Sequence, residues 1–232
     1  MKEEIELRES ESGLEWPYYK GQKALSASTL TQIFREIDEE WKKIPEYIIL
    51  KAAKNGNLFH SAIQEFLLAP NKAPKLPSPI SLNTQKKIQG AIDFFQRNDI
   101  SVNFRHFLGS EKLHYFFYQG ELLATYVDLE FTNYIIELKS NSSKMRGNNL
   151  NYLKFQIQLL IQHLCTKKRI YLLWSDEKET TFRKFQPTKE LLKILDTLIG
   201  FAKNKEEYPL LTKKNIIEKL LENYSPIGKF NR

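Results

Sequence analysis

The sequence is poor in cysteine and lacks any long apolar run, and each absence excludes a class of protein. The single cysteine, Cys165, excludes an internal disulfide framework, a zinc site built from cysteines and an iron–sulfur cluster held by one chain. No segment approaches the ~18 uninterrupted apolar residues typical of a membrane-spanning helix. The first twelve residues are acidic and contain no apolar core, so we expect no secretory signal, no membrane partner and a soluble, cytoplasmic protein.

Aromatic and aliphatic residues, by contrast, are plentiful. The 232 residues are 41% hydrophobic and include 15 Phe, 11 Tyr and 3 Trp, which is enough apolar surface to build a buried core. This composition excludes disorder of the whole chain. The length corresponds to one large domain or two small ones, since a domain usually holds about 100–200 residues.

Acidic residues are missing from one stretch of the chain, Ser140 to Arg169, which carries six basic residues with Tyr and Phe between them. The whole chain has 35 Lys and Arg against 28 Asp and Glu, a net charge of +7. A basic face with interleaved aromatic residues suits a polyanion such as nucleic acid, although a solvated, lysine-rich surface has the same composition. Lysines outnumber arginines by 27 to 8, which favours attraction of phosphates over bidentate reading of bases.

Helical patterns fill the first part of the chain. We interpret residues 1–24 as a poorly ordered lead-in and residues 25–98 as a helical N-terminal part. Ser28 predicts the N-cap of a helix, Pro45 the start of the next helix and Gly56 its end. Two further helices are expected on either side of a proline-rich loop, at residues 57–68 and 81–98.

Residues 99–186 predict a sheet, because runs rich in Phe, Tyr, Val and Ile alternate with Gly and Asn turns. The predicted strands are Val102–Leu108, Lys112–Tyr118, Glu121–Phe131, Tyr134–Leu138, Arg169–Trp174 and Thr180–Phe185. A long amphipathic helix at Asn149–Cys165 interrupts them, and residues 187–232 predict C-terminal helices. The chain therefore predicts one α/β domain with an N-terminal helical cap.

The segment TYVDLEFTNYIIELKS, residues 125–140, carries the clearest chemical pattern. Asp128 lies on the first strand of a predicted hairpin, and Glu137 and Lys139 lie on the second. Residues i and i+2 of a strand face the same side, so Glu137 and Lys139 project together, and Asp128 can reach that face across the turn. Two carboxylates beside a lysine can hold Mg²⁺ and steady an attacking water. The alternative is an exposed strand with an ordinary Glu–Lys pair.

Four further motifs accompany this pattern. LSASTLTQIF (25–34) opens a helix with serines, and GNLFHSAIQEF (56–66) places His60 four residues after a glycine. Glu111 opens the strand before the Asp128 strand, and YLKFQIQLLIQHLCTKKRIYLLWSD (152–176) leads from a Gln-x-Gln helix into an apolar strand. Together with Asp-x8-Glu-x-Lys, and in this order, the motifs resemble the PD-(D/E)XK nuclease superfamily, in particular its RecB-like and lambda-exonuclease-like branches.

The resemblance implies a restriction-endonuclease-like fold, with an αβββαβ core and a mixed central sheet flanked by helices, in a single nuclease domain at residues 25–232. It implies a metal-dependent DNA nuclease that hydrolyses phosphodiester bonds. The Gln-x-Gln helix and the RecB-like front end favour an exonuclease that acts on DNA ends in repair or recombination. A structure-specific or restriction-type endonuclease is the alternative, and a non-catalytic DNA-binding scaffold of the same fold is the alternative from another class.

The same resemblance assigns roles to individual residues. Asp128 and Glu137, with Glu111 or His60, are expected to ligate Mg²⁺ or Mn²⁺. Lys139 is expected to orient or deprotonate the attacking water. For His60 the alternative is a structural hydrogen bond inside the core, which is the commoner role of a histidine on an apolar helix.

Other assignments from the resemblance stay open. Glu121 and Glu130 are alternatives to Glu111, and Gln158 is expected to hold the catalytic lysine or the scissile phosphate. The chain departs from the family at Gln162, where many members have tyrosine. DNA is the expected partner, and a homo-oligomer is compatible with the lambda-exonuclease-like branch. The expected nucleic-acid contacts are Lys144, Arg146, Lys154 and Gln156.

Overall fold

The computed structural model describes residues 5–9, 13–38, 42–76, 80–98, 106–140, 149–204 and 209–222. Its centre is a five-stranded sheet in the order β4-β5-β6-β7-β8. Strand β5 runs antiparallel to both of its neighbours, β4 and β6. Strand β7 runs parallel to β6, and β8 runs antiparallel to β7. The strands are β4 (Phe107–Tyr118), β5 (Glu121–Phe131), β6 (Tyr134–Lys139), β7 (Arg169–Ser175) and β8 (Thr180–Lys184).

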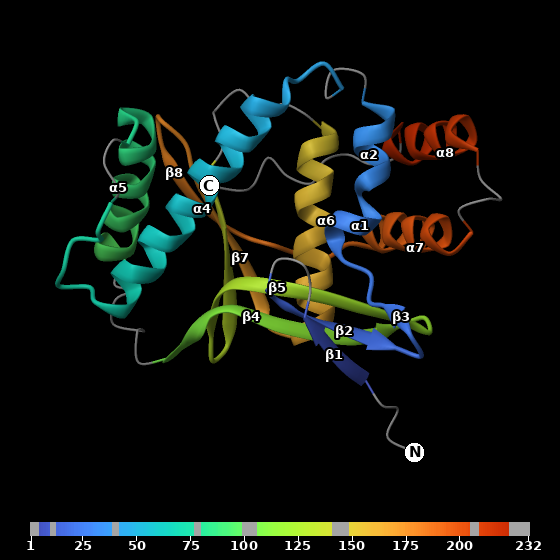
Figure 1. The fold of residues 1–232 in the computed structure, drawn as a ribbon, viewed down its shortest axis with the longest axis horizontal. Helices are drawn as coiled ribbons and strands as arrows, with labels where there is room; N and C mark the ends of the chain where they lie inside the picture. The colour runs from blue at the N-terminus through green and yellow to red at the C-terminus, as the bar shows by residue number, and fades with distance from the viewer. Residues whose placement is uncertain are drawn as a thin grey trace.

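Helices cover both faces of this sheet, as Figure 1 shows. The helices α4 (Glu46–Leu68) and α5 (Leu82–Arg97) lie on one face. The helices on the other face are α1 (Ala27–Leu30), α2 (Gln32–Ile37), α6 (Asn149–Thr166), α7 (Lys189–Lys203) and α8 (Leu210–Glu222). The chain order α5-β4-β5-β6-α6-β7 is the αβββαβ core that the sequence predicts, so the mixed α/β fold is confirmed. The N-terminal helices are divided between the two faces.

Each face of the sheet has its own apolar core. Phe59 and Ile63 of α4 and Phe95 of α5 are fully buried in one cluster with Ile136 and Leu138 of β6. On the other face, α6 contributes a stripe of buried residues at helical spacing to a second cluster with β5, β7 and α7. The stripe comprises Leu153, Ile157, Leu160 and Ile161. The two cores hold α4 and α6 on opposite sides of the same strands.

The interpretation of residues 1–24 as a poorly ordered lead-in is wrong for the residues that the structure describes. They form a three-stranded antiparallel sheet of β1 (Ile5–Glu9), β2 (Glu15–Tyr19) and β3 (Gln22–Lys23). Aromatic residues of β2 attach it to the main sheet, since Trp16 lies 5.8 Å from Tyr126 and Tyr19 lies 4.8 Å from Phe117, measured between ring centroids. The strand pattern of this segment is hard to recognise in the sequence, because glutamates are frequent in it and its apolar side chains are mostly aromatic.

Two helix boundaries also differ from the prediction. Ser26, and not Ser28, caps the first helix, because its hydroxyl accepts the backbone N–H of Thr29 at 3.0 Å. Helix α4 continues through Gly56. A glycine inside a helix costs about 1 kcal/mol relative to alanine, whereas burying one side chain such as Phe59 contributes about 1.5–3 kcal/mol. Burial of the apolar face therefore outweighs the glycine. The start of α4 after Pro45 is confirmed.

One strand replaces two predicted ones. The prediction separates Val102–Leu108 from Lys112–Tyr118 at Gly109, but β4 runs through this glycine. Gly109 has φ +138° and the register with β5 shifts beside it, so the glycine accommodates a β-bulge inside the strand. Residues 101–105 lie outside the described residues. None of the described helices combines the length and the apolar character that crossing a lipid bilayer needs.

Candidate active site

Asp128 occupies the point where β5 and β6 separate. These two strands pair at Leu129 with Ile136 and at Glu130 with Ile135. Beyond these pairs a side chain takes over, because the backbone N–H of Leu138 donates to Asp128 Oδ2 at 2.7 Å. The carboxylate thereby takes the place of a backbone acceptor between β5 and β6. This position fixes Asp128 between the strands, beside the residues that follow on β6.

Glu137 lies almost completely buried on the side of β6 that faces α6, with 1% of its surface exposed. Three donors hold its carboxylate. Gln158 Nε2 donates to Oε1 at 2.6 Å, and Lys139 Nζ bonds to the same oxygen. Gln162 Nε2 donates to Oε2 at 2.6 Å. Residues four apart on a helix share one face, so Gln158 and Gln162 can each donate a hydrogen bond to one oxygen of the same carboxylate.

Lys139 sits between the two carboxylates and an aromatic ring. Its ammonium nitrogen pairs with Glu137 and lies 5.3 Å from the ring centroid of Phe155 on α6. Burial lowers the pKa of Lys139, but the charges of Glu137 and Asp128 outweigh burial and hold this pKa above its usual value. Lys139 is therefore a cation at neutral pH, which suits it to orient a nucleophile or to balance negative charge and not to act as a base.

The carboxyl group of Asp128 has a different electrostatic state. Burial raises its pKa, and the neighbouring Glu137 carboxylate raises this pKa further. Lys139 and the Leu138 N–H act in the opposite direction, and the net pKa lies well above the usual value of an aspartate. Two carboxylates this close, one buried and one only partly exposed, repel each other, so an added cation between them would relieve the repulsion.

His60 reaches this site from the middle of α4. Its Nε2 lies 3.1 Å from the carbonyl oxygen of Leu138, and its Nδ1 lies 3.4 Å from Asp128 Oδ1. Burial lowers the pKa of His60, and the charge of Lys139 lowers this pKa further. The imidazole is therefore neutral at physiological pH, in the state that binds metals. His60 therefore makes a hydrogen-bond contact inside the protein, as the structural alternative predicts. It also lies beside Asp128, as the role of a metal ligand requires.

The donor atoms around these strands suit a hard divalent cation. Two carboxylates, from Asp128 and Glu137, converge with the carbonyl of Leu138 and the imidazole of His60. Oxygen-rich sets of this kind are typical of Mg²⁺ and Mn²⁺ sites. Within the described part of the chain, no three Asp, Glu, His or Cys side chains are already grouped as a metal-ligand set. The fit therefore depends on the two carboxylates and a backbone carbonyl.

Glu111 does not join the other predicted metal ligands as closely as the prediction requires. Its neighbours Ser110 and Lys112 pair with Leu129 and Val127, so Glu111 stands opposite Asp128 in the register. It has φ +51° and is exposed, and its side chain makes no hydrogen bond or ion pair with a described residue. Its charge still acts on His60. The structure thus leaves Glu111 at the rim of the site.

The two alternatives to Glu111 are engaged elsewhere. Glu130 is buried and bonds to Lys168 Nζ at 2.6 Å and to His114 Nε2 at 3.2 Å. Glu121 pairs with Lys203 of α7 at 2.7 Å. Both carboxylates therefore have structural partners away from Asp128.

The predicted nucleic-acid contacts are only partly visible. Lys144 and Arg146 lie outside the described residues. Lys154 is half-buried on α6, near Lys139. Gln156 is 5% exposed and its Oε1 has no partner, so it offers little surface to a nucleic acid. The residue that the sequence analysis missed is Gln162, whose spacing of four from Gln158 was the available signal.

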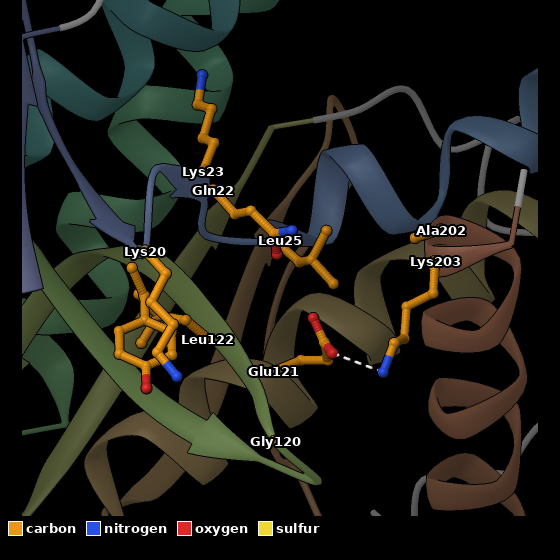
Figure 2. Close-up of a pocket in the computed structure, with 10 residues that line it drawn as sticks. Lys20, Gln22, Lys23, Leu25, Gly120, Glu121, Leu122, Ala202 and Lys203 are labelled. Atoms are coloured by element: carbon orange, nitrogen blue, oxygen red, sulfur yellow. Dashed lines mark ion pairs between the residues drawn. The ribbon is translucent and has the colours of Figure 1, made fainter. Parts of the chain in front are cut away.

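A separate cavity of about 430 Å³ lies at the other end of β5, where Glu121, an alternative to Glu111, lines it. Figure 2 shows it between β3, the β4–β5 turn and the end of α7. Lys20 and Lys23 line one side, and the Glu121–Lys203 ion pair closes the other. Glu121 and Asp128 are seven positions apart on β5, so this cavity does not belong to the candidate active site.

No protein-family model and no curated protein sequence matches the chain. Solved structures do match it. The structure of SSO0001 is 15% identical, covers 83% of this chain and 80% of its own, and has a TM-score of 0.38. A candidate exonuclease from Eubacterium rectale is 14% identical, covers 79% of this chain and 82% of its own, and has a TM-score of 0.44. Similarity at this level does not decide the function, which has to be argued from the site.

Proposed function

We propose that this protein is a metal-dependent nuclease that hydrolyses phosphodiester bonds in DNA. One observation carries the proposal: Asp128, Glu137 and Lys139 meet where β5 and β6 separate. Gln158 is bonded there to Glu137, and His60 to the carbonyl of Leu138. A purely structural ion pair would not need a second carboxylate, only partly exposed, whose pKa is raised by its desolvation and by the charge of Glu137. The resemblance of the motifs to PD-(D/E)XK nucleases points to the same chemistry.

In this proposal Asp128, Glu137 and the Leu138 carbonyl hold Mg²⁺ or Mn²⁺, and His60 completes the set. The cation, when bound, lowers the pKa of water and neutralises charge on the phosphate. The chain itself supplies the geometry. Gln158 and Gln162 fix both oxygens of Glu137, and the Leu138 N–H fixes Asp128, so the carboxylates are held in place before substrate arrives.

In this proposal Lys139 acts as a fixed positive charge. Its raised pKa keeps it protonated, so it donates a hydrogen bond to the attacking water or to a phosphate oxygen and takes no proton from the water. Charge builds on the phosphate oxygens in the transition state, and a preorganised cation stabilises that charge more than it stabilises the ground state.

An exonuclease that acts on DNA ends is the form of activity that we propose. Linear, nicked and closed circular DNA should be incubated with the protein in Mg²⁺, in Mn²⁺ and in EDTA. Loss of linear DNA alone, only with metal, is the expected result. Cutting of closed circles would assign an endonuclease, and binding without cutting under all conditions would assign a scaffold and contradict the proposal.

Two variants make this assay specific to the site. Asp128→Asn keeps an acceptor for the Leu138 N–H but removes the charge, so it should fold and fail to cut. Glu121→Gln changes a carboxylate on the same strand that pairs with Lys203, so it should cut normally. Metal binding is tested separately by soaking crystals in Mn²⁺. Absence of Mn²⁺ within coordinating distance of both Asp128 and Glu137 would count against the metal site.

A further inference from the structure

Gly56 is a glycine that the described part of the structure does not require. It lies in the middle of the 23-residue helix α4, where glycine is less favourable than alanine. Its backbone is helical and has no positive φ, so alanine could adopt the same conformation. A Cβ atom at Gly56 would meet no atom of a described residue within 4 Å. Neither backbone conformation nor packing among the described residues therefore accounts for the glycine.

The other two glycines of the described helices differ from Gly56. A Cβ atom at Gly90 would come within 2.8 Å of Thr180 Oγ1, so this glycine lets α5 approach β8. Gly200 also faces open space, but it lies in the last turn of α7, and its carbonyl accepts the backbone N–H of the C-cap residue Asn204. A glycine costs less there, because helix ends fray. Gly56 has neither explanation.

Gly56 lies beside the candidate metal site. Residues four apart on a helix share one face and are about 6 Å apart along its axis, so Gly56 lies one turn before His60 on the same face. His60 Nε2 lies 3.1 Å from the carbonyl oxygen of Leu138, and its Nδ1 lies 3.4 Å from Asp128 Oδ1. Side chains of a helix lean toward its N-terminus. The open space in front of Gly56 therefore adjoins the imidazole.

The part of α4 that contains Gly56 is accessible to a ligand. The buried residues of this helix begin at Phe59, and every position from Glu46 to Asn57 is at least partly exposed. Three large apolar side chains are among the exposed ones, namely Tyr47, Ile48 and Leu50. A ligand can therefore reach Gly56 without displacing a packed element.

We propose that Gly56 is a positioning residue, which leaves room for the nucleotide next to the phosphate that is cut, so that the substrate strand passes against the backbone of α4. This inference rests on the proposed nuclease function, because that function brings a phosphate to Asp128 and Glu137. The distance of about 6 Å between Gly56 and His60 along the helix is comparable with one or two nucleotide steps of about 3.4 Å. Glycine permits the closest approach of a backbone to a ligand.

The first test compares side chains of increasing size at Gly56 and at Gly200. Alanine and leucine both favour helices, so Gly56→Ala should raise the melting temperature by about 2–4 °C, and Gly56→Leu should not lower it. Cleavage of linear DNA should nevertheless fall about 10-fold in Gly56→Ala and about 10²-fold in Gly56→Leu, because a displacement of about 1 Å can cost that much. Gly200→Ala and Gly200→Leu, the matched controls, should cut normally.

Two results of this test overturn the proposal. Normal cleavage in both Gly56 variants would show that no strand passes there. A lower melting temperature in Gly56→Ala would show that the fold itself needs the glycine. Binding of Mn²⁺, followed by the shift in melting temperature, should have the wild-type midpoint in Gly56→Ala. A changed midpoint would assign the space to the metal and would also overturn the proposal.

The second test asks whether a smaller substrate rescues the larger side chain. A three-carbon spacer without sugar and base replaces the nucleotide on either side of the cut in turn. Gly56→Leu should cut one of these substrates faster, relative to wild-type protein, than it cuts the unmodified strand. Equal ratios for all three substrates overturn the proposal.

The inference and the proposed function can fail separately. If wild-type protein cuts no DNA with any metal, the nuclease proposal fails. The affinity of Gly56→Leu for linear DNA in EDTA, compared with that of Gly200→Leu, still decides whether a strand passes Gly56. If wild-type protein cuts DNA and both Gly56 variants cut equally well, this inference fails and the nuclease proposal stands.

Discussion

Replacing Gln162 by leucine should lower the metal affinity of the protein by more than the accompanying loss of stability explains. Gln162 has no exposed surface and holds Glu137 Oε2 at 2.6 Å, with a longer bond of 3.3 Å to the carbonyl of Tyr126. A hydrogen bond to a charged group contributes about 1.5–3 kcal/mol. The Oε1 atom of the same side chain is buried without a partner, and an unsatisfied buried acceptor costs about 1–3 kcal/mol.

These two effects offset each other only in part in Gln162→Leu, because leucine removes the unsatisfied oxygen but leaves the buried Oε2 of Glu137 without its donor. We therefore expect the free energy of unfolding of the metal-free protein to fall by about 1–3 kcal/mol. Glu137 keeps its contacts to Oε1 but loses the one donor that fixes Oε2. Loss of such an orienting contact typically lowers metal affinity or activity about 10–100-fold.

The assay is cleavage as a function of Mg²⁺ concentration, with Mn²⁺ binding followed by the shift in melting temperature. Ile161→Ala is the matched control, since Ile161 is fully buried one residue earlier on α6. That control should lose about 2–5 kcal/mol of stability and keep the wild-type metal midpoint. A wild-type midpoint in Gln162→Leu would show that this glutamine is only part of the core, and the reasoning from the Glu137 contacts would be refuted.

Three further predictions concern the cations. Lys139→Ala should lower kcat by about 10²–10³-fold while DNA affinity changes little, because the charge acts on the transition state; normal turnover in a cleavage assay would remove Lys139 from the mechanism. DNA affinity should fall as pH rises above about 8, because the pKa of Lys154 is about 8 in the free protein and only its charged form attracts phosphate; binding isotherms should lose this dependence in Lys154→Gln and keep it in Lys86→Gln. Lys144→Ala/Arg146→Ala, in the sequence between Lys139 and α6, should make the salt slope of DNA binding shallower by about 0.9 per lost phosphate contact and weaken binding equally across sequences. Unchanged affinity and slope in that double variant would show that Lys144 and Arg146 do not contact DNA.

The parts of the site that the sequence could predict are those encoded over short distances. Asp128, Glu137 and Lys139 lie on one hairpin, and strand alternation alone places Glu137 and Lys139 on one face. The same locality explains why the sheet strands and α6 could be recognised. The partner that a side chain finds on another element was not predictable in this way, because Gln162 meets Glu137 only when α6 packs against the sheet.

The errors of the sequence analysis have a common physical origin. Gly56 and Gly109 are local signals for an end, yet α4 and β4 continue through them because tertiary burial and a bulge compensate. The sheet formed by β1, β2 and β3 was missed because it depends on ring contacts of Trp16 and Tyr19 with β5 and β4, which no local pattern reports. Glu111 was expected among the ligands, but its φ of +51° sets it apart from a regular strand residue.

The way His60 joins the site has a consequence for the order in which the protein folds. Asp128 and its partner Leu138 are 10 residues apart in the chain, Gln162 follows Glu137 by 25, and His60 precedes Leu138 by 78. Contacts between residues far apart in sequence form later, because closing a longer loop loses more chain entropy. We therefore expect the carboxylates to meet early and the histidine to arrive last, with the docking of α4. A chain that is only partly folded would then carry an incomplete site, and hydrolytic competence would report on the finished tertiary structure.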